Sequence, residues 1–112
     1  MTTMGIREHA QTAREFLQSS EKLWGAFSHA MTAISQDRGW DYGTHRETIT
    51  AGQRLDDELN DANLQAGVWA ARSFHMNFYN GSMEYYEMEL GRPIVRAFIE
   101  RVLGLLAERS SR

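Results

Sequence analysis

The stretch WAARSFHMNFYNG, residues 69 to 81, decides how the rest of this 112-residue chain is interpreted. Its apolar residues recur at the spacing of one buried helical face, and it ends in Asn-Gly, a typical left-handed helix terminus. The same helix carries Arg72, His75 and Tyr79 at positions i, i+3 and i+7, which places these polar side chains along one face. Polar groups set into an apolar helix must find partners or carry chemistry, so this stripe is the first candidate site.

Composition favours one helical, globular domain over residues 1–112. Apolar residues make up 42% of the chain and aromatic residues 11%, which is enough for a hydrophobic core. A single proline and the lack of any alternating, strand-like run predict an all-α fold. The absence of cysteine excludes disulfides, thiolate metal sites and a cysteine nucleophile. No segment reads as a signal peptide or a spanning helix, so we expect a cytoplasmic protein without membrane contact.

The charge balance argues against broad affinity for nucleic acid. The formal net charge is −3, whereas phosphate neutralisation needs an excess of cations. Lys22 is the only lysine among twelve basic residues, and arginines dominate the end of the chain. Arginine makes forked contacts with carboxylates and phosphates, so the last helix could dock an acidic protein or peptide. Solvated helix faces would give the same pattern.

The longest apolar pattern predicts one helix from about Ile6 to Gln36. Apolar residues alternate steps of three and four over four heptads. Such a helix would be about 46 Å long, which exceeds the size of a compact domain of this length. We therefore expect it to bend near Ser19-Ser20 or to pack partly against a second subunit.

Local start signals place the next two helices. Thr44 begins a capping box with Glu47, which predicts a helix over about residues 45–59. Asp61 is a good N-cap for a further helix over about residues 62–80.

The final helix is expected over about residues 82–109, beginning at a Ser82 cap. Its apolar phase survives Pro93, which predicts a kinked or two-piece helix. Together these elements predict an up-and-down bundle of four or five helices with short loops, a long first helix and a kinked last one.

Several kinds of site lack their motifs in this chain. There is no glycine-rich nucleotide loop and no serine elbow, and we expect no cofactor. A di-metal site would want Glu-x-x-His on paired helices, but Arg72 stands three residues before His75 and Ala26 three before His29. We therefore expect no metal, although a single zinc held by His29, His45 and His75 is left open.

Two interpretations fit the polar stripe. In the first, His75 is a core histidine bonded to a backbone carbonyl, Tyr79 is a core aromatic, and Arg72 pairs with Glu47 or Glu84. In the second, Arg72 and a neutral His75 face a groove, where the arginine steadies a phosphate and the histidine moves a proton. That is the minimum equipment for cleaving RNA, because the 2′-hydroxyl supplies the nucleophile.

Three segments in this order and separation resemble the HEPN superfamily: SEKLWGAFSHAM at 20–31, GTHRE at 43–47 and SFHMNFYNG at 73–81. The resemblance covers roughly residues 10 to 105. It implies an up-and-down helical bundle that usually dimerises. The superfamily includes RNA-cleaving toxins paired with nucleotidyltransferase antitoxins, as well as many inactive members.

The chain departs from the nuclease motif of that superfamily, in which an arginine, four to six residues and a histidine are commonly followed by a tyrosine two further on. Only two residues separate Arg72 from His75, and Tyr79 comes four after the histidine. A literal match runs from Arg38 to His45, but it spans the first interhelical loop. His45 would also fit as a side chain that packs over this loop.

The resulting hypothesis is an HEPN-like, non-catalytic binding or interaction module that acts as a homodimer. RNA or a nucleotide is the expected ligand class, and a nucleotidyltransferase-type protein is the expected partner. The alternatives are a metal-independent endoribonuclease, with Arg72, His75 and Tyr79 as catalytic residues, and a structural partner-binding bundle. The candidate binding residues are Arg72, His75, Asn77, Tyr79, Arg38 and His45.

Overall fold

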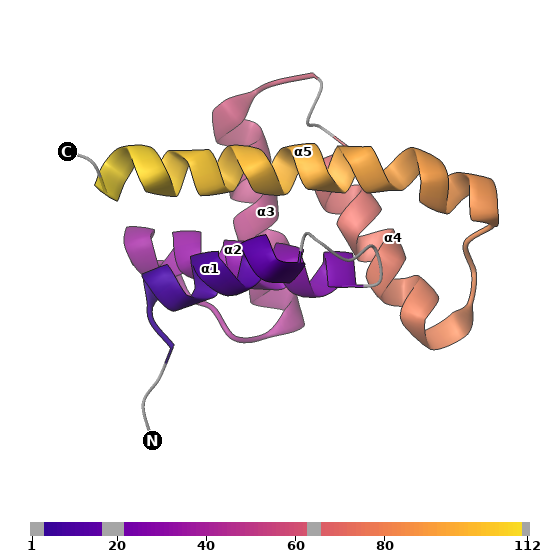
Figure 1. Cartoon of the computed structure of the whole chain (residues 1–112), viewed down its shortest axis with the longest axis horizontal. Coiled ribbons are helices and arrows are strands. Elements are labelled where there is room, and N and C mark those ends of the chain that lie inside the picture. Colours follow the sequence, from indigo (N-terminus) through magenta and orange to yellow (C-terminus); the bar gives the residue numbers. More distant parts are fainter. Residues whose placement is uncertain (1–3, 17–21, 63–65, 111–112) are drawn as a thin grey trace.

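The computed structural model describes residues 4–16, 22–62 and 66–110, and its regular structure there is entirely α-helical (Figure 1). The five helices are α1 (Ile6–Phe16), α2 (Leu23–Arg38), α3 (His45–Leu59), α4 (Gly67–Asn80) and α5 (Tyr85–Ser110). The predicted all-α fold is confirmed for these residues. None of the helices described is long and apolar enough to cross a membrane.

Residues 6–16 and 23–36 belong to two separate helices, α1 and α2, so the predicted single long helix is wrong. The chain leaves α1 at Phe16 and enters α2 at Leu23. Ser19-Ser20, where a bend was expected, lies outside the described residues. Two helices that face one core keep the same steps of three and four, so the apolar pattern alone does not show where the chain turns.

The first two helices pack antiparallel to each other. At one end the Gln36 side chain donates a hydrogen bond to the Met4 carbonyl over 3.0 Å. At the other end Phe16 lies so close to Gly25 that an added Cβ would stand 2.7 Å from its ring. The amphipathic pattern is therefore satisfied within one chain, and it no longer requires a second subunit.

The core lies where α2 meets α5, which crosses the bundle as its longest helix (Figure 1). Phe27 and Phe98 are fully buried with their ring centroids 6.0 Å apart. Burying one such side chain contributes roughly 1.5–3 kcal/mol. Gly67 opens α4 directly against Phe98, and a Cβ there would lie 2.7 Å from the Cβ of that phenylalanine.

The start of α3 is the predicted capping box. The Glu47 backbone N–H donates to the Thr44 hydroxyl over 3.1 Å, and the Thr44 N–H donates to the Glu47 carboxylate over 3.1 Å. The predicted boundaries of this helix, 45–59, coincide with the observed ones. The capping box therefore fixes His45 as the first residue of α3.

The predicted N-cap of the following helix is wrong. Asp61 does not cap α4, which begins at Gly67 after Ala66, a residue that makes no side-chain cap hydrogen bond. The close contact of Gly67 with Phe98 offers a physical reason, since tertiary packing rather than a capping side chain positions this helix start. The predicted end is confirmed, because Gly81 adopts a left-handed φ of 58° after Asn80.

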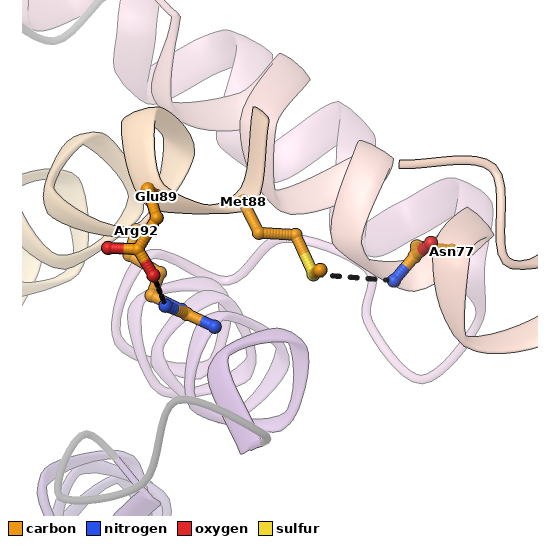
Figure 2. A network of polar contacts seen from close by, with 4 residues as sticks. All are labelled: Asn77, Met88, Glu89 and Arg92. Atoms are coloured by element: carbon orange, nitrogen blue, oxygen red, sulfur yellow. Dashed lines mark hydrogen bonds and ion pairs between the residues drawn. The ribbon is translucent and has the colours of Figure 1, made fainter. Parts of the chain in front are cut away.

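Asn77 joins α4 to α5. Its side-chain oxygen accepts a hydrogen bond from the Met83 N–H over 2.9 Å, and its amide nitrogen lies 3.8 Å from the Met88 sulfur (Figure 2). The Glu84 N–H donates to the Glu87 carboxylate over 2.9 Å at the start of α5. These contacts fix the angle at which α5 leaves α4.

The start and course of α5 differ from the prediction. The helix begins at Tyr85 rather than at a Ser82 cap. It then continues without interruption through Pro93 to Ser110, so the two-piece alternative is wrong. Arg92 pairs with Glu89 one turn away on the same helix (Figure 2).

Candidate functional site

Two of the histidines singled out by the sequence meet in one aromatic cluster. The imidazoles of His45 and His75 are stacked, with centroids 4.7 Å apart and an interplanar angle of 25°. The Trp24 ring lies 4.3 Å from His75 and 5.2 Å from His45. The three side chains come from α3, α4 and α2, so the packing of these helices creates the histidine cluster, as Trp24, His45 and His75 are called below.

Within the histidine cluster, the surroundings of His75 favour its neutral form. Burial lowers the pKa of His75, and the neighbouring charge of His45 lowers it further. His75 is half-buried, whereas His45 is exposed. A neutral imidazole next to a solvent-exposed one can accept a proton from a substrate hydroxyl. Two imidazoles and an indole also offer flat faces on which a base can stack.

Arg72 lies on a different surface from the histidine cluster. Its exposed side chain lines an open groove of about 300 Å³ between α4 and the start of α5. The other residues of this groove, called the α4–α5 groove below, are Trp69, Ser73, Met76, Ser82, Met83 and Glu87. Among the described residues, Arg72 makes no ion pair with Glu47 or Glu84.

The remaining members of the predicted stripe have separate positions. Asn77 is engaged in the turn between α4 and α5 through Met83 and Met88. Tyr79 belongs to α4, but its side chain lies outside the part of the structure that is described. The proposed groove lined by all four side chains therefore stays a hypothesis, with Arg72 and His75 in different surroundings.

The alternative pair, Arg38 and His45, has no contact in common. Arg38 forms an ion pair with Glu58, and its hydrogen bond holds the pKa of that carboxyl below the ordinary value. Its guanidinium also lies over the Trp40 ring, 5.4 Å from the centroid, where Arg54 stacks at 5.2 Å. Instead of packing over this loop, His45 packs against the rings of α2 and α4.

A second histidine pair joins α1 to α2, and sequence reasoning missed it. The Nδ1 atoms of His9 and His29 are 2.7 Å apart and share a hydrogen bond, and Phe16 meets His29 edge-on at 5.4 Å. Burial lowers the pKa of both histidines, and the His9 charge lowers that of His29 further. The pair could have been predicted only if the antiparallel packing of the two helices had been recognised.

The zinc site that the sequence left open needs His29, His45 and His75 together, and the structure does not bring these three residues together. His29 contacts His9, whereas His45 and His75 contact each other. Within the described ranges, no group of three or more histidines, aspartates or glutamates could hold a metal ion. At 2.7 Å the two Nδ1 atoms are also too close to enclose an ion, because each zinc–nitrogen bond needs about 2.0–2.1 Å.

The arginines of α5 are partly engaged within the chain. Arg92 pairs with Glu89, and the Arg109 guanidinium lies 2.9 Å from the Asp37 carboxylate of α2. These contacts reduce the positive charge that the last helix offers to an acidic partner.

Comparison with known proteins gives a match to the model of a protein family. No curated protein and no solved structure matches this chain. A family model, described as the archaeal PaREP1/PaREP8 family, matches residues 6–99. That range includes α1 to α4 and most of α5, and with them the histidine cluster and the α4–α5 groove. The chain therefore belongs to the archaeal PaREP1/PaREP8 family.

Proposed function

We propose that this protein is a non-catalytic binding module that acts as a homodimer. The observation that carries this proposal is the exposure of large apolar side chains on α4 and the first half of α5. The exposed fractions are 68% for Trp69, 71% for Tyr85, 65% for Tyr86 and 66% for Leu90. Several large apolar side chains exposed on two consecutive helices are typical of interaction surfaces, since monomeric proteins rarely keep large apolar patches in water.

The expected ligand of the module is RNA or a nucleotide, bound at the histidine cluster. Stacking of a base on an aromatic side chain contributes roughly 1–3 kcal/mol, and Trp24, His45 and His75 provide ring surfaces. The net charge of −3 favours a local contact over binding along a phosphate backbone. The HEPN-like segments support the same ligand class and a nucleotidyltransferase-type partner, in a cytoplasmic setting.

Two measurements test the module. Sedimentation at micromolar concentration should show a dimer, and monomer alone would contradict the homodimer. Thermal unfolding with nucleotides and short RNA oligomers should show a rise in melting temperature, because a ligand at 100 times its Kd adds about 2.7 kcal/mol. His45→Ala should abolish the rise. A melting temperature unchanged by every nucleotide and oligomer would contradict the nucleic-acid ligand.

The contact between His45 and His75 favours a second candidate, a metal-independent endoribonuclease. Neutral His75 would take the proton of a 2′-hydroxyl, whose oxygen then attacks the adjacent phosphorus. Protonated His45 would deliver its proton to the departing 5′-oxygen, leaving a 2′,3′-cyclic phosphate. Arg72, which the sequence assigned to the phosphate, lines the α4–α5 groove instead, so this candidate rests on His75 and His45, with Tyr79 in its predicted orienting role.

RNA cleavage in the presence of EDTA tests this second candidate. His75→Ala should abolish cleavage, because the base is lost, while the far-UV circular dichroism stays unchanged. The matched control is His9→Ala, which removes the same side chain from the other histidine pair and should leave cleavage intact. Cleavage that survives in purified His75→Ala would contradict the ribonuclease.

A further inference from the structure

We propose that the α4–α5 groove is where two copies of this chain meet, with Arg72 of each copy facing Glu87 of the other. The inference rests on the proposed homodimer and specifies its contact surface. Its basis is the composition of one groove, in which apolar side chains and two opposite charges lie together.

The apolar part of the groove comes from exposed side chains of α4. Trp69 and Met76 line it, and their exposed fractions are 68% and 47%. A tryptophan side chain carries roughly 150–250 Å² of surface, so the exposure of Trp69 leaves roughly 100–170 Å² in water. A standard interface buries about 800 Å² on each partner, so the contact would have to extend from the groove over the exposed start of α5, where Tyr86 and Leu90 lie outside the groove lining.

The charges of the groove select a second copy as the occupant. Arg72 and Glu87 line the same groove, and within the described residues Arg72 has no hydrogen bond or ion pair. One Glu87 oxygen accepts from the Glu84 N–H, and the other is available to a partner. In a two-fold contact the same surface meets itself, so each arginine can face the partner's glutamate. An anionic ligand would be attracted by Arg72 and repelled by Glu87.

Charge reversal tests the cross-subunit pair. Arg72→Glu or Glu87→Arg alone should raise the dimer Kd at least about tenfold, as measured by sedimentation. In each variant, like charges face each other at both symmetry-related contacts between the subunits. Mixing the two variants in equal amounts should restore a dimer, since both contacts in the mixed pair then join opposite charges. Arg46→Glu is the matched control, because it makes the same charge change at an exposed position of α3.

Glu87→Arg also removes the hydrogen bond from the Glu84 N–H at the start of α5, so a second variant without this side effect is needed. Trp69→Ser changes an exposed side chain and should also raise the dimer Kd without unfolding the protein. If the wild-type protein is a dimer but Arg72→Glu and Trp69→Ser leave its Kd unchanged, and mixing the charge variants has no effect, this contact is overturned. The homodimer itself is then still supported. A monomeric wild-type protein overturns both. Weakening of the dimer by each charge reversal without recovery on mixing also overturns the Arg72–Glu87 contact between subunits.

Discussion

The two histidine pairs of this protein differ in how their rings meet. His9 and His29 point nitrogen to nitrogen between α1 and α2, and their Nδ1 atoms share a hydrogen bond over 2.7 Å. His45 and His75 meet face to face, and His45 is exposed to solvent. The same residue type therefore serves two arrangements, one that joins helices and one that presents ring surface.

This difference separates stability from function. The hydrogen bond commits Nδ1 of His9 and Nδ1 of His29 to each other, so a substrate could engage these two nitrogens only by breaking the contact between α1 and α2. The stacked contact of His45 with His75 uses the ring faces and does not require a ring nitrogen of His45. Changes at the first pair are expected to alter the free energy of unfolding, and changes at the second to alter ligand binding or cleavage.

The largest expected effect comes from crowding the contact beside His29. In Gly25→Ala the new Cβ would stand 2.7 Å from Phe16, whose ring meets His29 edge-on, and overpacking of this kind costs about 1–3 kcal/mol. Urea unfolding should show this loss. Gly104→Ala is the control, because a Cβ there meets nothing within 4 Å and a helical alanine is favoured over glycine. Equal urea midpoints for Gly25→Ala and wild type would contradict the close packing of α1 on α2.

Acidification is the next test of the contrast. The folded pKa values of His9 and His29 lie below the ordinary 6.5, so the unfolded chain binds protons more readily. Their contribution to stability is complete above pH 6.5 and is lost as the pH falls through the lowered values. When both rings are protonated, the shared hydrogen bond is lost as well, at a cost of about 1 kcal/mol. Glu8 opposes this by favouring charged His9.

The check is urea unfolding at pH 7.5 and pH 5 in wild type and in His9→Leu. The variant removes one member of the pair, so its stability should fall less on acidification than that of the wild type. A parallel fall in both proteins would assign the pH dependence to other groups, with His75 as the first candidate because its pKa is also lowered.

Local signals predicted the parts of the fold that depend on a few neighbouring residues. The Thr44–Glu47 capping box and the Asn80-Gly81 terminus are satisfied by backbone geometry within a few residues, and both are present. The antiparallel packing of α1 on α2 and the late start of α4 at Gly67 depend on side chains far away in the sequence. The predictions for these two features were wrong for that reason.

The candidate site divides in the same way. His75 and His45 could be singled out from local patterns, but their contact depends on how α3 and α4 pack around Trp24 of α2. Arg72 and His75 are three residues apart and thus about 60° apart around the helix, at 3.6 residues per turn. That difference is enough for Arg72 to line the α4–α5 groove while His75 joins the histidine cluster.

The smallest expected effect on stability belongs to His45→Ala. The side chain is exposed, and replacing it removes a ring contact of about 0.5 kcal/mol. Its informative effect is on His75, whose pKa should rise once the neighbouring charge is gone, while burial keeps it below 6.5. Proton NMR of the His75 ring across a pH titration measures this directly. A pKa of His75 that does not move in His45→Ala would mean that the charge of His45 does not act on His75, which removes the electrostatic basis for dividing the base and acid roles between them.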